Sequence, residues 1–315
     1  MRILLLVLTV LGFAYGGVHA VDIRPSSPDS SSPGIRILDQ KQLIFEKVKG
    51  VKFSEISDLA YDKKTHILYM VSDEGKLYSF TGNFDDKIRN LKPLDAVTLK
   101  KKKGKKFKNW RHDSEGMTLD GKRRLLISFE GKAKISWFHK NSSKFGRQIK
   151  KYRLPSVLTN SKNFRTRNKS LEALAWHPKY GILTAAEWPL KKDPKKTQTI
   201  YALNGRKWHF KAEPEARSAV SAIEVMADGN LLVLERSYSD LLSPFVVTLK
   251  KVYLDRCKKG WCHTKVLAKM NSHKGWGVDN FEGLTRISGD RYLMVSDDND
   301  NFFQKTLLIY FEVTE

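Results

Sequence analysis

The chain has little cysteine, with only Cys257 and Cys262 among its 315 residues. A cysteine-based metal site would need more soft ligands close by, and only His263 offers itself. The two cysteines are separated by Lys-Lys-Gly-Trp, a spacing that in an exported protein suits a disulfide across a hairpin. We therefore expect Cys257 and Cys262 to be bonded to each other.

Acidic residues are few compared with basic ones. The chain has 57 Lys and Arg against 34 Asp and Glu, which gives a formal net charge of +23. Such a charge favours anionic partners, namely phosphate esters, nucleic acid, acidic polysaccharide or a membrane surface. A basic surface that serves only solubility would have the same composition. We expect an anionic small molecule or a polyanion as the ligand.

Long apolar runs are absent after the N-terminal segment. Residues 1–20 combine Arg2, a short apolar core and the small residues of Val18-His19-Ala20, the pattern of a signal peptide. The predicted mature chain begins at Val21 and has no transmembrane segment. We expect an exported monomer, and the sequence does not distinguish periplasmic from extracellular placement.

Several catalytic motifs are also missing. The sequence has no Gly-x-Ser-x-Gly elbow, no His-Glu-x-x-His pair and no Gly-rich phosphate loop, so serine hydrolase, zincin and nucleotide-binding functions lack support. The histidines show no metal-ligand spacing. His112 and His273 differ from the others because each precedes a glutamate of the repeat described next.

The sequence does contain a glutamate that recurs with its flanking residues. The spacings between successive copies are 60, 57, 52 and 58 residues, and the five copies are Glu55, Glu115, Glu172, Glu224 and Glu282. A nearly constant period of this length indicates a repeat architecture. A second apolar run in each copy ends in another acid, which is Asp73, Glu130, Glu187, Glu235 or Asp297.

Short alternating or β-branched runs divide each repeat into predicted strands. The expected strands are 56–61, 67–72, 76–84, 94–100, 116–119, 124–129, 134–139, 148–154, 172–176, 181–187, 198–203, 207–212, 221–226, 230–235, 245–254, 262–269, 283–287, 291–296 and 306–313. The last repeat has three strands, and a leading strand over 35–45 would complete it.

This arithmetic predicts an all-β fold, a β-propeller of five four-stranded blades closed by the N-terminal strand. A sixth blade would require that two sheets are merged in this count. The Ser- and Pro-rich residues 21–34 are predicted to be a flexible linker, and 35–315 the propeller domain.

In a propeller, the start of the first strand and the end of the second lie on one face, so both acids of each repeat should meet at one mouth of the central channel. Adjacent carboxylates raise each other's pKa, so cations, protons or arginines must balance them. Calcium, which accepts six to eight oxygen ligands, is the expected cation. The candidate ligands are Glu55, Glu115, Glu172, Glu224, Glu282, Asp73, Glu130 and Asp297.

Two other interpretations of the glutamates remain open. They could accept hydrogen bonds from backbone N–H groups of a neighbouring sheet and so brace the fold. They could also pair with an arginine, for which Arg236, beside Glu235, is the best-placed candidate.

At these phrases the chain resembles the phytase-like proteins described by an esterase-like activity of phytase. The words that carry the resemblance are Asp113-Ser114-Glu115-Gly116-Met117, Ser170-Leu171-Glu172-Ala173-Leu174, Ala222-Ile223-Glu224-Val225-Met226, Leu232-Val233-Leu234-Glu235-Arg236-Ser237 and Asp279-Asn280-Phe281-Glu282-Gly283-Leu284. The resemblance implies an exported β-propeller that hydrolyses phosphate esters. β-Propeller phytases are calcium-dependent and six-bladed, with acidic residues at one channel mouth that hold metal and substrate phosphate.

The sequence therefore suggests a calcium-dependent phosphate-ester hydrolase. In this hypothesis the catalytic residues are Glu115, Glu282 and Arg236, and the residues that bind the anionic substrate are Arg111, His112, Lys76 and His273. The rival hypothesis is a non-catalytic propeller that binds a protein, glycan or other polyanion through basic loops such as 100–106. Export disfavours nucleic acid as the partner.

Overall fold

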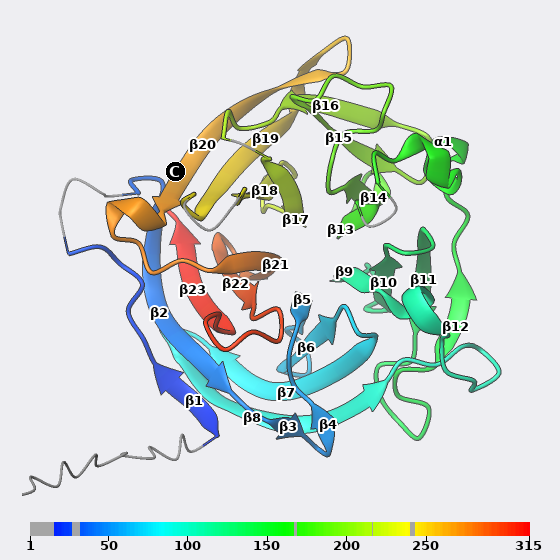
Figure 1. Ribbon diagram of the computed structural model, residues 1–315, viewed down its shortest axis with the longest axis vertical. Helices are drawn as coiled ribbons and strands as arrows, with labels where there is room; N and C mark the ends of the chain where they lie inside the picture. The colour runs from blue at the N-terminus through cyan, green and yellow to red at the C-terminus, as the bar shows by residue number, and fades with distance from the viewer. Residues whose placement is uncertain (1–15, 27–31, 167–168, 216, 240–242) are drawn as a thin grey trace, which may run out of the picture.

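The structure is a computed structural model, and it describes residues 16–26, 32–166, 169–215, 217–239 and 243–315. Antiparallel sheets stand around a central axis, with the first strand of each repeat innermost (Figure 1). The fold is all-β and of propeller type, as the sequence predicts.

The strands of the first three repeats follow one another from the axis outward. The first sheet contains β5 (Ile56–Asp62), β6 (Ile67–Ser72), β7 (Lys76–Phe84) and β8 (Ile88–Thr98). The second contains β9 (Ser114–Leu119), β10 (Leu125–Phe129), β11 (Lys134–Phe138) and β12 (Gln148–Lys151). The third repeat forms β13 (Leu171–His177), β14 (Gly181–Ala186), β15 (Thr197–Ala202) and β16 (Lys207–Lys211).

The fourth repeat forms β17 (Ala219–Val225), β18 (Leu231–Ser237), β19 (Val246–Lys258) and β20 (Trp261–Asn271). A single parallel bridge between His209 of β16 and Trp261 of β20 joins the third and fourth groups into one eight-stranded sheet. The bridge forms because β19 and β20 are long enough to reach the outer edge of the third group.

The last sheet combines the two ends of the chain. It contains β21 (Asn280–Ser288), β22 (Arg291–Asp297), β23 (Leu307–Val313), β2 (Ile35–Ile44) and β1 (Gly17–Ala20). β2 runs antiparallel to β23, with Ile35 opposite Val313. The predicted leading strand therefore does pair with the last strand of the chain.

Short elements complete the fold. They are β3 (Lys47–Val48), β4 (Val51–Lys52), α1 (Ser156–Thr159) and the single 3₁₀ turns η2 (Asn109–His112), η3 (Ser161–Asn163) and η4 (Ser272–Lys274). Among the described residues, no helix is long and apolar enough to cross a membrane.

Part of the predicted linker over 21–34 contacts the last sheet, whereas residues 27–31 lie outside the described residues. Ile23 is buried among the core residues of the last sheet. Its backbone N–H donates to Gln40, and its carbonyl accepts from the Gly277 N–H. Val21 also packs against this core, so two apolar residues and their backbone hydrogen bonds hold residues 21–23 in place. The predicted signal peptide falls largely outside the described residues, except for β1.

Glycine follows the repeat glutamate where two inner strands approach closely. A Cβ atom on Gly116 would lie 2.4 Å from the Glu172 carbonyl oxygen, and one on Gly283 would lie 2.8 Å from the Asp58 Cα. Only glycine fits these two positions, so the Glu-Gly words mark the packing of one inner strand against the next.

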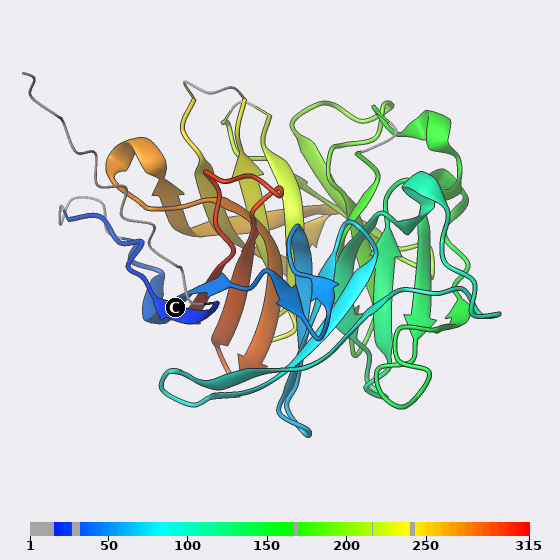
Figure 2. The same cartoon turned by 60° about the horizontal axis from the view of Figure 1, so that its bottom comes forward.

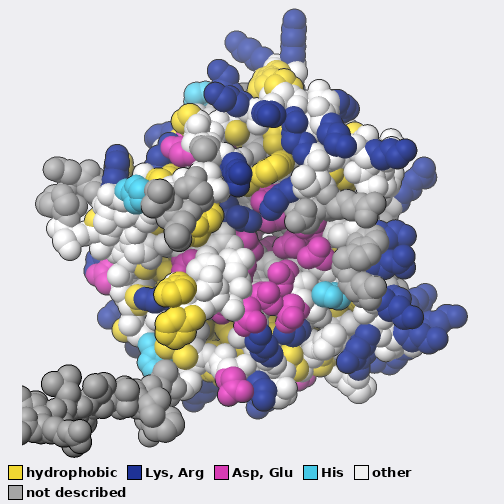
Figure 3. Space-filling model, viewed as in Figure 1, with side chains coloured by type: hydrophobic (Ala, Val, Ile, Leu, Met, Phe, Trp, Pro, Cys, Tyr) yellow, Lys and Arg dark blue, Asp and Glu magenta, His cyan; other side chains and the backbone are white. Residues whose placement is uncertain are grey.

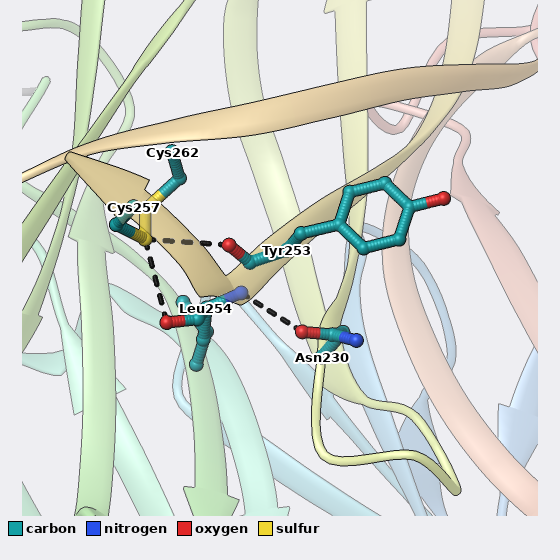
Figure 4. Close-up of a disulfide and its surroundings, with 5 residues drawn as sticks. All are labelled: Asn230, Tyr253, Leu254, Cys257 and Cys262. Atoms are coloured by element: carbon teal, nitrogen blue, oxygen red, sulfur yellow. Dashed lines mark hydrogen bonds between the residues drawn. A yellow bond between two sulfur atoms is a disulfide. The ribbon is translucent and has the colours of Figure 1, made fainter.

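The predicted disulfide between Cys257 and Cys262 is confirmed (Figure 4). It closes the hairpin between β19 and β20, five residues apart in sequence. Close to it, the Leu254 N–H donates to the Asn230 side chain at 2.8 Å, which ties the hairpin to the turn before β18.

Candidate functional site

Carboxylates gather at one end of the inner strands, where Figure 3 shows Asp and Glu side chains at the centre of the face and Lys and Arg around its edge. Glu115 of β9, Glu172 of β13 and Glu282 of β21 lie near the starts of their strands. The carboxylates that follow or end the second strands lie beside them, because antiparallel neighbours bring those two ends together.

Two groups of three carboxylates are close enough to share a cation. In one, ligand atoms of Asp113, Glu115 and Glu130 all lie within 4.8 Å of one another. In the other, the same is true of Glu130, Glu172 and Glu187. Glu130 belongs to both groups, so the two candidate cation positions are adjacent. Ser170 fixes Glu130 by donating its backbone N–H to a carboxylate oxygen at 3.0 Å.

A third set of acids continues the cluster toward β21 and β6. The Asn280 amide donates to Glu282 at 2.9 Å and to Asp297 at 3.4 Å, and so holds these two side chains together. Asp73 lies close enough to Asp297 to raise its pKa, and Glu282 in turn raises the pKa of Asp73. The acidic cluster comprises Asp73, Asp113, Glu115, Glu130, Glu172, Glu187, Glu282 and Asp297.

Two basic side chains offset part of this negative charge. A terminal nitrogen of Arg236 lies 2.9 Å from Glu282, 3.4 Å from Glu187 and 3.8 Å from Glu172. Lys169 lies 2.6 Å from Glu187. These carboxylates raise the pKa of Arg236 despite its burial, so the guanidinium is charged. Eight carboxylates against two cations leave the site with excess negative charge when it is fully ionised.

The pKa directions reflect that excess. Burial, followed by neighbouring carboxylates, raises the pKa of Asp73 and Glu130 to about 8 and that of Asp297 to about 9. The pKa of Glu115 and Glu172 is raised well above the usual range for the same reasons. Without added cations, the cluster therefore binds protons at neutral pH, and a divalent cation would compete with them.

Glu224 does not join the cluster, contrary to the predicted ring of five equivalent glutamates. It is the sixth residue of β17, whereas Glu172 is the second residue of β13. Its carboxylate accepts the backbone N–H groups of Val225 at 2.6 Å and Arg286 at 3.0 Å. It lines a cavity with Tyr61 and Trp176 at the other end of the inner strands.

Arg236 occupies the place in β18 that the other repeats give to the second acid. It pairs with Ala219 at the start of β17, as Asp297 pairs with Asn280. Glu235, the predicted second acid, lies one residue before this position and pairs with Val220. It points into the sheet, where Lys250 contacts it at 2.8 Å and the Ser218 hydroxyl donates to it.

Glu55 lies at the edge of the cluster, just before β5. Its backbone adopts a positive φ of 56°, and its N–H donates to Asp298 at 2.9 Å. Burial raises its pKa, with smaller effects from Glu74 and Asp300. Its carboxylate raises the pKa of Asp73, so Glu55 is close to the cluster while outside the two groups of three.

The bracing interpretation of the repeat acids holds for Glu224 and for an acid that the sequence did not single out. Asp58, on β5, accepts the backbone N–H groups of Met117 at 2.6 Å and Leu284 at 3.0 Å. It thus links the inner strand of one sheet to those of both neighbours. The acids at one end of the strands face one another, and those further along tie strands together.

Three of the four predicted anion-binding residues lie on the face of the cluster. His112 of η2 has its Nδ1 3.4 Å from the Asp73 carbonyl oxygen, and Lys76 pairs with Glu74. Arg111 precedes His112, and its carbonyl accepts the Lys134 ammonium group at 2.6 Å. Burial lowers the pKa of Lys134 to about 7.

His273 lies apart from the other three. It is exposed on η4, which follows the outer strand β20 at the edge of the ring (Figure 1). Its place just before a repeat glutamate in sequence does not bring it to the cluster, because the connection from an outer strand to the next inner strand spans the width of a sheet.

A cavity of about 740 Å³ opens beside the cluster, between the second and third sheets. Four basic residues line it, together with Glu130 of the cluster: Arg111, Lys132, Lys151 and Arg153. The basic loop 100–106, by contrast, lies on the outer side of the second sheet. There the backbone of Lys100 forms β-bridges with that of Lys106 and that of Arg147. The basic residues beside the cluster are thus those of the cavity and not those of the loop 100–106.

The donor set fits a hard divalent cation. Both groups of three consist of carboxylates alone, and Ca²⁺, Mg²⁺ and Mn²⁺ prefer such oxygen ligands, whereas Zn²⁺ and copper favour histidine or cysteine. Asp73 also has a buried carboxylate oxygen that no hydrogen bond satisfies among the described residues. The residues present therefore fit a cation such as calcium, although they do not single it out.

Asp113 and Lys169 were not expected at the site, and Glu187 was expected at the channel mouth as a second acid but was not among the candidate ligands. Asp113 stands inside the first repeat phrase, directly before the strand that carries Glu115. Glu187 ends the second run of its repeat, as Glu130 does. Aligning the repeats on the acid after the second strand, instead of on the first glutamate, would have shown that Arg236 replaces this acid in the fourth repeat.

Solved structures resemble this chain only distantly. The PQQ-bound aldose sugar dehydrogenase from Streptomyces coelicolor has a TM-score of 0.46 and 10% identity, over 88% of this chain and 97% of that chain. Virginiamycin B lyase from Staphylococcus aureus, with quinupristin, has a TM-score of 0.43 and 9% identity, over 94% and 99%. No curated protein sequence matches the chain.

The family comparison is more specific. Residues 51–300 match the Phytase-like family, whose description is esterase-like activity of phytase. This region contains every member of the acidic cluster together with Arg236 and Lys169. The chain therefore belongs to the Phytase-like family.

Proposed function

We propose that the protein is an exported hydrolase of phosphate esters that holds calcium in its acidic cluster. The observation that carries the proposal is the pair of carboxylate groups that share Glu130. Family membership supports ester hydrolysis, and the net charge of +23 supports an anionic substrate. Within this proposal, the eight-stranded sheet counts as two blades, which gives a five-bladed propeller whose axis ends at the cluster.

Asp113, Glu115, Glu130, Glu172 and Glu187 would hold the cation. When bound there, calcium would polarise a phosphoryl oxygen and lower the pKa of a water molecule. Arg236 keeps Glu172, Glu187 and Glu282 in place and adds a fixed positive charge beside the reacting phosphate. Arg111, His112 and Lys76 lie on the same face, where they would orient the anionic substrate.

In this proposal the acidic cluster binds the cation, and the basic residues around it bind the anionic substrate. Oxygen ligands attract the cation, which reverses the local charge and lets an anion approach. The basic residues of the cavity between the second and third sheets then favour binding of an anion next to Glu130. Disulfide formation and the predicted signal peptide support export.

The test is hydrolysis of a panel of phosphate monoesters and diesters by purified protein. We expect activity with added calcium and its loss when a chelator is present. Glu115→Gln and Arg236→Met should remove activity while the protein remains folded by circular dichroism. Protein that binds no calcium and hydrolyses none of the esters with calcium present would contradict the proposal.

The cationic cavity favours a second candidate, a non-catalytic protein that binds a polyanion. Such a protein would bind heparin or polyphosphate in a manner that weakens with salt. Binding would survive Glu115→Gln but decrease when Lys132 and Lys151 are changed to Gln. The hydrolysis panel and this binding assay together separate the two functions.

A further inference from the structure

Two adjacent phenylalanines project from the face of the acidic cluster. Phe302 is 96% exposed and Phe303 is 85% exposed, whereas the next most exposed large apolar residue described, Leu94, is 46% exposed. Their ring centroids are 5.7 Å apart at an interplanar angle of 81°. Exposed apolar side chains are common singly, but two such rings side by side at a loop tip indicate a surface that becomes buried in use.

The loop that carries them is held in place by polar contacts at its base. The Gln304 amide donates to Asp279 at 3.0 Å, and the Lys305 N–H donates to the same carboxylate at 2.8 Å. The Phe303 N–H donates to the Asn301 side chain at 3.1 Å. The fold therefore holds both rings away from the core, and their exposure follows from an anchored loop.

The loop emerges beside the candidate site. It joins β22 to β23, and Figure 2 shows it at the same end of the molecule as η2 and α1. Asp297, a member of the acidic cluster, stands at its start. Asp298 contacts the backbone of Glu55, the acid at the edge of the cluster. A surface that received the two rings would therefore face the mouth of the site.

Basic residues around the acidic cluster, at the edge of this face, favour a negatively charged surface. The cavity between the second and third sheets contributes Arg111, Lys132, Lys151 and Arg153. The acids of the loop are already engaged, because Asp298 accepts from the Thr306 hydroxyl and Asp300 pairs with Lys52. A net charge of +23 would also draw the whole molecule toward an anionic surface.

A second copy of the chain fits these observations less well. Stable protein interfaces bury roughly 800 Å² on each partner, far more than two side chains supply. Two copies, each with a net charge of +23, would also repel each other. A lipid bilayer needs only a small apolar wedge combined with basic residues, which is what this face provides.

We propose that the face of the acidic cluster docks on anionic phospholipid, with Phe302 and Phe303 inserted between the headgroups. Docking would place the mouth of the site against a layer of phosphodiester groups. This proposal does not depend on hydrolysis, because binding to lipid is measured without turnover.

The experiment is cosedimentation with vesicles of phosphatidylglycerol and phosphatidylcholine in equal parts, and with vesicles of phosphatidylcholine alone. All variants share one N-terminus, verified by mass spectrometry, because residues 1–20 are apolar. We expect the wild type to bind the mixed vesicles and F302S/F303S to bind at least about tenfold more weakly. Leu94→Ser, which removes an exposed apolar side chain from the outer strand β8, is the matched control and should bind as the wild type does.

A second variant reports on insertion directly. The tryptophan emission of Phe302→Trp, after subtraction of the wild-type spectrum, should shift to shorter wavelength on mixed vesicles. Equal binding by F302S/F303S and wild type, or no shift for Phe302→Trp, would overturn the proposal. A wild-type dimer that F302S/F303S converts to a monomer would also overturn it, in favour of self-association.

Discussion

The two ends of the inner strands use the same residue type in opposite ways. At one end, Glu115 and Glu172 face other carboxylates. Burial raises the pKa of both side chains, and the neighbouring carboxylates raise it further. At the other end, Glu224 receives two backbone N–H groups. Glu224 is therefore satisfied within the fold, whereas Glu115 and Glu172 need a proton or a cation from outside. The candidate site is therefore distinguished by carboxylates whose charge the fold does not balance. The presence of a glutamate alone does not identify it.

The largest difference between the two ends should appear in Glu130→Gln. Glu130 belongs to both groups of three carboxylates, so its loss should weaken calcium binding and hydrolysis more than about 100-fold, since even outer partners of metal ligands contribute roughly 10–100-fold. Calcium titration and ester hydrolysis measure this effect. Full activity in Glu130→Gln would show that the active site does not lie at the acidic cluster.

Arg236→Met should destabilise the calcium-free protein. It leaves Glu172, Glu187 and Glu282 without their shared cation, at an expected cost of about 2 kcal/mol at pH 8, less than the roughly 3–5 kcal/mol found when a fully buried pair is broken. The cost should shrink at pH 5, because the pKa values of Glu172 and Glu282 are raised by burial and these two carboxylates bind protons there. Urea unfolding at both pH values measures it, and an equal cost at both would contradict the pairing.

Thermal unfolding should depend on pH in a direction set by the raised pKa values. The folded pKa of Asp73 and Glu130 is about 8, above the roughly 4 expected when unfolded, so the folded state binds protons more tightly. Their stabilising contribution is full below about pH 4 and is lost as the pH rises through about 8.

Chelated protein should therefore melt at a lower temperature at pH 9 than at pH 6, and the increase in Tm on adding calcium should be larger at pH 9. Differential scanning fluorimetry measures both. An increase that is the same at both pH values would show that calcium does not compete with these protons.

Glu224→Gln gives the smallest expected effect. The amide still accepts one hydrogen bond, so the free energy of unfolding should fall by about 1 kcal/mol while hydrolysis and calcium binding stay at wild-type levels. Urea unfolding and the hydrolysis assay measure the two quantities. A loss of calcium binding in Glu224→Gln would show that both ends of the inner strands belong to one site.

Much of the fold was predictable because alternating apolar residues and turn residues define strands locally. The expected strands 67–72 and 76–84 coincide with β6 and β7, and the pairing of the leading strand with the end of the chain follows from counting strands. The docking of Ile23 was not predictable, because it depends on a contact with residues more than 250 positions away.

The site was predictable in part. The period located Glu115, Glu172 and Glu282, but it placed Glu224 with them although their registers differ by several residues. A sequence period does not fix register, because a repeat can keep a glutamate while the strand starts elsewhere. Arg236 was found as a neighbour of Glu235, and only the strand pairing shows that it takes the place of an acid.

The proposed function requires that the acidic cluster binds calcium. Isothermal titration of calcium into chelator-free wild-type protein at pH 8 and pH 6 measures this binding. We expect saturable binding at pH 8 that releases protons, and weaker binding at pH 6, where Asp73 and Glu130 are protonated. No calcium binding at pH 8, or binding of equal strength at both pH values, would contradict it.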